Sequence, residues 1–63
     1  MSDILTTIEA AQYIRLAKPT LERYRITGDG PKFAKMGSSV RYRRADLDAW
    51  LESRLVNSTS EAA

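Results

Sequence analysis

The sequence contains no cysteine and no histidine among its 63 residues. Without cysteine the chain can form no disulfide bond, and the lack of both residues removes zinc sites of the Cys/His kind and histidine acid–base catalysis. The missing cysteines also fit a reducing compartment. We therefore expect a domain that is held by its hydrophobic core, with no metal and no cofactor.

Long apolar runs are also absent. No segment approaches the roughly 18 apolar residues that are needed to span a bilayer. The first ten residues, MSDILTTIEA, lack the basic start and the apolar run of a signal peptide. We expect a soluble cytoplasmic protein, without membrane association, that forms a single small domain of marginal stability.

Charge is unevenly distributed along the chain. Nine basic and two acidic residues lie between residues 15 and 44, a local charge of +7, whereas the rest carries one basic and six acidic residues, a charge of −5. This split suggests a basic face that is oriented toward a polyanion. On charge alone, a solvated surface of mixed charge fits equally well.

Two helices are predicted in the first half of the chain. The letters TTIE at 6–9 form a capping-box pattern, and apolar residues recur at helical spacing after it, which predicts a helix over 7–14. Pro19 suits the first turn of a second helix over 18–27, and Gly28 suits its C-terminal cap. About three residues join the helices, which is a helix-turn-helix spacing.

A hairpin and a third helix are predicted in the second half. After the turn signal GDGP at 28–31, strands are expected over about 32–36 and 40–43, joined by a turn at 37–39. The third helix should open at about Ala45 and end between residues 54 and 56, with an apolar stripe at Leu47, Trp50, Leu51 and Leu55. Trp50 fits the core better than a stacking platform.

These elements predict one fold class: mainly α with a small β-hairpin, a winged helix-turn-helix in the order α-α-β-β-α. The domain should span residues 1–56, followed by a disordered polar tail at 57–63. Asp46 and Asp48 diverge on a helix and are better explained as helix-start charges than as paired catalytic carboxylates. The predicted core consists of Leu5, Ile8, Ala11, Ile14, Leu21, Tyr24, Phe33, Val40, Tyr42, Leu47, Trp50 and Leu51.

The second helix of such a fold can enter the major groove of DNA. Arg23 is the first candidate for a bidentate bond to guanine, and Glu22 can accept from a cytosine amine or hold Arg23 in place. Lys18, at the helix start, is better suited to phosphate. Thr20, Arg25 and Thr27 lie nearer the edges of this face.

The stretch GSSVRYRR at 37–44 makes the hairpin basic. On a strand, Val40 and Tyr42 point to one face and Arg41 and Arg43 to the other, so one face completes the core while the other can reach phosphates or the minor groove. The alternative is an edge strand that charge protects from aggregation. The expected DNA-binding residues are Lys18, Thr20, Glu22, Arg23, Arg25, Thr27, Lys35, Ser38, Ser39, Arg41 and Arg43; Thr7 is equally explained as a phosphate contact or as a capping residue.

Three stretches, LTTIEAAQYI, PTLERYRITGDGPKFAKMG and VRYRRADLDAWL, together resemble the small excisionase and AlpA-like DNA-binding proteins with a MerR-type winged helix-turn-helix. The resemblance covers residues 5–55. It implies double-stranded DNA as partner, with Thr20, Glu22 and Arg23 in the helix and Ser38, Ser39 and Arg41 in the wing as contacts. It further implies excision of a mobile element or regulation of prophage genes, contact with an integrase, and cooperative self-association on DNA.

The chain departs from this family at two places. Ala17 stands where the family commonly has a serine or threonine cap for the second helix, and alanine cannot cap, at a cost of about 1 kcal/mol. Ser38 and Ser39 occupy a wing tip that is commonly basic. A second hypothesis is an adaptor whose basic face binds an acidic protein such as a recombinase. The sequence carries no nucleophile–base pair and no phosphate-binding glycine loop, so we expect no enzyme.

Overall fold

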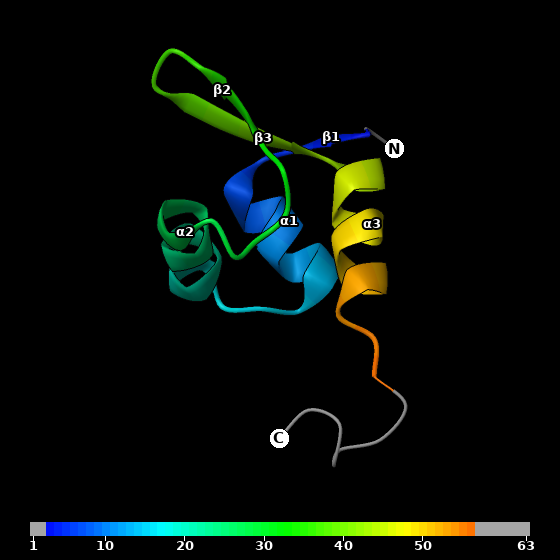
Figure 1. Cartoon of the computed structure of the whole chain (residues 1–63). Coiled ribbons are helices and arrows are strands. Elements are labelled where there is room, and N and C mark those ends of the chain that lie inside the picture. The colour runs from blue at the N-terminus through cyan, green and yellow to red at the C-terminus, as the bar shows by residue number, and fades with distance from the viewer. Residues whose placement is uncertain (1–2, 57–63) are drawn as a thin grey trace.

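The computed structural model describes residues 3–56, and the predicted tail at 57–63 lies outside them. Three helices pack beneath a small antiparallel sheet, and the tip of the β2–β3 hairpin projects away from the helices on the side of α2 (Figure 1). The elements in chain order are β1 (Ile4–Leu5), α1 (Thr7–Ile14), α2 (Lys18–Thr27), β2 (Ala34–Met36), β3 (Ser39–Arg43) and α3 (Arg44–Ser53). The predicted winged helix-turn-helix is therefore confirmed, with one additional strand.

Helix α1 begins with the predicted capping box. The Oγ1 atom of Thr6 accepts from the amide of Glu9 at 3.2 Å, and Glu9 Oε1 accepts from the amide of Thr6 at 2.9 Å. Both bonds satisfy amides that the first turn cannot pair within the helix. The helix ends at Arg15, which adopts a left-handed conformation with φ of 59°.

Helix α2 has the predicted bounds and begins without a side-chain cap. Ala17 occupies the N-cap position with extended backbone, and no side chain of residues 3–56 caps the first turn. Pro19 stands in that turn, where its missing amide costs nothing. Gly28 closes the helix with φ of 83°, and its amide donates to the carbonyl of Tyr24 at 2.8 Å.

The sheet has a third strand and a shorter turn than the expected hairpin. Strand β3 pairs with β2 and also with β1, a two-residue strand that the sequence analysis did not predict. Met36 pairs with Ser39, so Gly37 and Ser38 alone form the turn, and Ser39 belongs to the strand. Gly37 has φ of 63°, as the first position of a two-residue hairpin turn commonly requires.

Helix α3 begins at Arg44 and ends at Ser53, slightly earlier than predicted at both ends. The apolar stripe therefore stops at Leu51, and Leu55 lies beyond the helix with 70% of its surface exposed. Asp46 lies in the first turn, as expected for a helix-start acid. Asp48 accepts a hydrogen bond of 2.6 Å from the Tyr13 hydroxyl, which ties α3 to α1.

The buried core lies where α1, α2, α3 and β3 meet. It consists of Ala10, Ala11, Ile14, Leu21, Tyr42 and Leu47, with Leu5, Leu16, Val40, Trp50 and Leu51 packed against it. Three core predictions were wrong: Ile8 is 52% exposed, Phe33 is 40% exposed, and Tyr24 is half-buried outside the core cluster. Ile8 faces outward because Ala10, Ala11 and Ile14 form the buried side of α1. The ring of Phe33 is tilted by 50° to that of Tyr42, with ring centroids 6.1 Å apart.

The GDGP segment is held tightly between α2 and α3. Trp50 Nε1 donates to the carbonyl of Asp29 at 2.9 Å, and Arg54 donates to the same oxygen. A Cβ atom on Gly30 would lie 2.9 Å from Cβ of Tyr24, so the chain passes where only glycine fits. Within residues 3–56, no helix is long and apolar enough to cross a bilayer.

Candidate nucleic-acid interface

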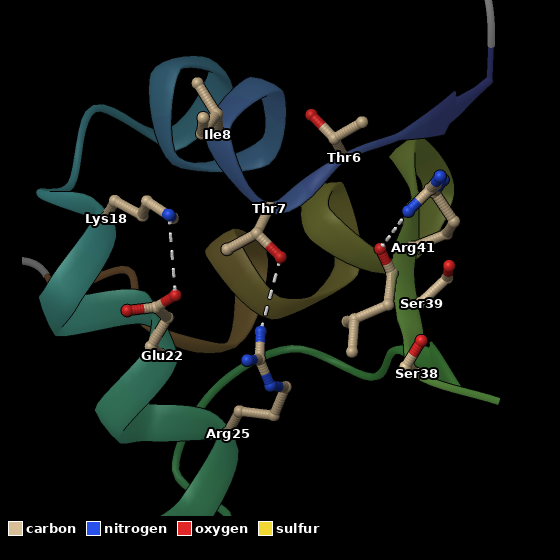
Figure 2. Close-up of a pocket in the computed structure, with 10 residues that line it drawn as sticks. Thr6, Thr7, Ile8, Lys18, Glu22, Arg25, Ser38, Ser39 and Arg41 are labelled. Atoms are coloured by element: carbon tan, nitrogen blue, oxygen red, sulfur yellow. Dashed lines mark hydrogen bonds and ion pairs between the residues drawn. The ribbon is translucent and has the colours of Figure 1, made fainter. Parts of the chain in front are cut away.

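An open groove of about 360 Å³ lies between α2, the start of α1 and the β2–β3 hairpin. Figure 2 shows its walls: Lys18, Glu22 and Arg25 come from α2, and Ser38, Ser39 and Arg41 from the hairpin. The lining residues are Thr6, Thr7, Ile8, Lys18, Glu22, Arg25, Ser38, Ser39, Val40 and Arg41. Six of the eleven candidate DNA-binding residues thus meet at one concave surface.

The α2 wall of this groove carries an exposed ion pair. Lys18 Nζ lies 3.7 Å from Glu22 Oε2, one helical turn away, and about half of each side chain is exposed. Such a surface pair contributes little to stability, so the lysine remains able to move to a phosphate. The structure pairs Glu22 with Lys18, which corrects the expectation that Glu22 holds Arg23 in place.

Arg25 joins three elements at the floor of the groove. Its Nη1 donates to Thr7 Oγ1 at 3.3 Å and to the hydroxyl of Tyr42 at 3.2 Å. Its guanidinium carbon also lies 5.8 Å from the ring centroid of Phe33, within the range of a cation–π contact. Arg25 therefore fixes α2 against the start of α1 and against the hairpin, besides contributing charge.

The hairpin wall contributes two hydroxyl groups and one cation. Arg41 is half-buried, and its Nη1 donates to the carbonyl of Val40 at 2.8 Å. It forms no ion pair with any carboxylate within residues 3–56. Its charge is therefore not neutralised by an acid of the described chain, which suits an incoming anion.

Five candidate residues lie outside the groove: Thr20, Arg23, Thr27, Lys35 and Arg43. Arg23 is exposed on α2, with its guanidinium carbon 5.8 Å from the ring centroid of Tyr24. The Thr27 hydroxyl hydrogen-bonds to the carbonyl of Tyr24 at 3.3 Å and to Asp29 at 3.1 Å. Lys35 is exposed on β2.

Arg43, the last residue of β3, forms an ion pair with Asp46 of α3. Its Nε and Nη2 donate to the two carboxylate oxygens of Asp46 at 2.7 and 2.9 Å. This bidentate pair lowers the pKa of Asp46 and raises the pKa of Arg43. The hairpin arginines thus differ in role: Arg41 lines the groove, whereas Arg43 anchors the start of α3.

Four groove residues were absent from the sequence-based set: Thr6, Thr7, Ile8 and Val40. The capping-box pattern located the start of α1, and it left Thr7 open between a capping and a phosphate-binding role. Thr6 is the cap, and the Thr7 hydroxyl accepts from Arg25. The sequence does not show that the start of α1 lies beside α2 and the hairpin, because that proximity depends on tertiary packing.

A metal centre finds no support in the described part of the chain. Within residues 3–56, no three His, Cys, Asp or Glu side chains gather where they could hold a metal ion. The groove instead offers three cations, one carboxylate and several hydroxyl groups. This set of groups can bind phosphates and the polar edges of bases.

A helix pair followed by a basic hairpin defines the winged helix-turn-helix class. The family model described as helix-turn-helix domain matches residues 4–55, nearly all of the described chain. The chain belongs to this helix-turn-helix family, which supports a DNA-binding function. No match was found among curated proteins.

Proposed function

We propose that this protein binds double-stranded DNA sequence-specifically, as a mobile-element or prophage factor of the excisionase or AlpA-like kind. The observation that carries the proposal is the groove in which Lys18, Arg25 and Arg41 converge from the second helix and the wing. Cations on two separate elements can hold adjacent stretches of the phosphate backbone and so set the orientation of α2. The domain is assigned to residues 1–56, and it acts in the cytoplasm.

In this proposal α2 lies in the major groove and the hairpin reaches the neighbouring backbone or minor groove. Arg23 is exposed and can bond a guanine edge, while Glu22 can release Lys18 and accept from a cytosine amine. Lys18 and Arg41 contact phosphates, and the small side chains of Ser38 and Ser39 allow the wing tip to approach the backbone. Thr20, Thr27 and Lys35 flank these contacts.

The more specific role rests on the resemblance of the sequence to excisionase and AlpA-like proteins. A domain with so small a core and one short recognition helix has few base contacts, so several copies along repeated sites would increase specificity. Excision requires such copies to bend DNA beside an integrase, and gene activation requires them near a promoter. Both roles predict binding close to the gene of this protein.

The test is a gel-shift titration against DNA that flanks the gene, at two salt concentrations, with random duplex as competitor. Laddered shifts that survive the competitor and weaken at high salt would support specific binding by several copies. No shift even at low salt would refute DNA binding by the protein alone. It would favour the adaptor hypothesis, in which the basic face binds an acidic protein such as a recombinase.

Replacing the recognition arginine provides a sharper test of the base contacts. Arg23→Ala should weaken binding by about 1–3 kcal/mol and relax base preference at one position of the site. Arg44→Ala at the start of α3 is the matched control, because it also removes an arginine side chain, one that pairs with Asp3 outside the proposed contacts. If Arg23→Ala selects the same sequences with unchanged preference, Arg23 does not contact a base as proposed.

A further inference from the structure

Ile26 is the most exposed large hydrophobic residue within residues 3–56, with 86% of its surface open to solvent. It lies on α2, the helix that carries Lys18, Glu22 and Arg23. Single exposed apolar residues are common on protein surfaces, so exposure alone indicates nothing. What distinguishes Ile26 is its place on the recognition helix.

The geometry of α2 places Ile26 on the ridge that points away from the protein. Leu21 is fully buried and marks the side of α2 that faces the core. At about 100° per residue, Ile26 lies roughly 140° around the helix from Leu21, beside Pro19 and between Glu22 and Arg23. This ridge is the part of α2 that would enter a major groove most deeply.

We propose that Ile26 determines specificity by contacting the C5-methyl group of a thymine in the major groove. The inference rests on the proposed DNA binding and adds a named base to it. The thymine methyl is the apolar group on base edges in that groove, and aliphatic side chains recognise it by contact. Glu22 and Arg23, which flank Ile26, suit the polar edges of the neighbouring base pairs.

The contact is tested by removing the methyl group from the DNA and the side chain of Ile26 from the protein. The preferred site is first selected from random duplex with the parent protein, and each thymine is then replaced in turn by deoxyuridine, which lacks only the methyl group. The parent should lose about four-fold in affinity at one position, the equivalent of one buried methyl group. Ile26→Ala should bind the thymine site about four-fold more weakly and show no preference at that position.

The controls separate this contact from folding and from the proposed function. Leu55→Ala also removes an exposed aliphatic side chain, one beyond α3, and should keep the full preference for thymine. Thermal melting should show both variants folded as the parent is, because neither side chain is in the core.

Three results would overturn the inference. The parent could show no preference for thymine at any position, although it binds DNA, or Ile26→Ala could retain the preference of the parent. Ile26→Ala could also keep the affinity of single copies and lose the higher bands of the ladder, which would place Ile26 in a contact between proteins. Failure of the parent to bind any duplex would refute the proposed function itself.

Discussion

The charge of Arg41 allows the most direct test of the groove. Arg41 forms no ion pair with a carboxylate within residues 3–56, and it lines the groove opposite Lys18. Each phosphate that a protein cation neutralises contributes about −0.9 to the slope of log affinity against log salt concentration. If the three groove cations each meet one phosphate, the slope is about −2.7 for the parent and about −1.8 for Arg41→Gln.

The assay is a fluorescence anisotropy titration on one duplex between about 50 and 200 mM salt, in which the slope difference changes the affinity ratio by about 3.5-fold. The parent should lose its advantage over Arg41→Gln as salt increases, while both keep the same base preference. The reason is that a phosphate contact carries no sequence information.

Arg44→Gln is the matched control because it makes the same chemical change outside the groove. Arg44 Nη2 lies 2.9 Å from Asp3 Oδ1, so this cation is already paired. Its removal should leave the salt slope close to that of the parent. An unchanged slope for Arg41→Gln, or an equal reduction for both variants, would refute the assignment of Arg41 as a local phosphate contact and would favour net charge as the cause.

Two further predictions concern the ends of the helices. Ala17→Ser should supply the missing cap of α2 and stabilise the domain by about 1 kcal/mol, which raises Tm by about 4–8 °C. Thr6→Ala should lower Tm by a similar amount because it removes the cap of α1. Tm values equal to that of the parent in a calorimetric scan would contradict these two predictions. Asp46 has a pKa below its ordinary value because of Arg43, so its stabilising effect is present above about pH 4 and is lost as the pH falls through the lower folded pKa. Asp46→Asn should therefore show a smaller decrease of Tm between about pH 4 and pH 2 than the parent, and the same decrease in both would contradict the pairing.

Local signals predicted the helices well because each signal acts within a few residues. The capping box fixed the start of α1, and Pro19 with Gly28 fixed the bounds of α2. Strand β1 was missed since two residues, Ile4 and Leu5, carry no alternating pattern of their own. They form a strand only because β3 offers them a paired edge, which is a tertiary effect.

The errors in the core have a similar origin. Ile8 was assigned to the core because it shares a helical spacing with Ala11 and Ile14. The structure instead buries Ala10 beside those two residues, which turns Ile8 outward. In a helix of eight residues the spacing of apolar residues does not decide which side is buried, and close packing of alanines cannot be predicted from hydrophobicity. Phe33 stands before β2, and its ring packs against that of Tyr42 at an interplanar angle of 50° while 40% of its surface stays exposed.

The candidate site could be predicted as a set of residues but not as a surface. Arg41 and Arg43 are equivalent in the sequence, two positions apart on one strand. The structure separates them because Asp46, three residues after Arg43, lies where the strand runs directly into α3. The bidentate pair with Asp46 holds Arg43 more firmly than the single exposed contact with Glu22 holds Lys18, and which pair forms depends on the positions of the neighbouring elements.

Arg25 shows how closely the binding surface and the core depend on each other in so small a domain. Its guanidinium lines the groove, yet its hydrogen bonds reach Thr7 on α1 and the hydroxyl of Tyr42, a residue that is 1% exposed. Truncating Arg25 would leave that hydroxyl without its donor and would loosen the hairpin against α2, at a cost typical of a lost hydrogen bond to a charged group. A loss of DNA affinity in an Arg25 variant would therefore combine a missing contact with a displaced wing. Within residues 3–56, Lys18 pairs with Glu22 and Arg41 donates to the carbonyl of its own neighbour Val40, so neither holds a buried side chain as Arg25 does. Substitutions there measure the contact with DNA more directly.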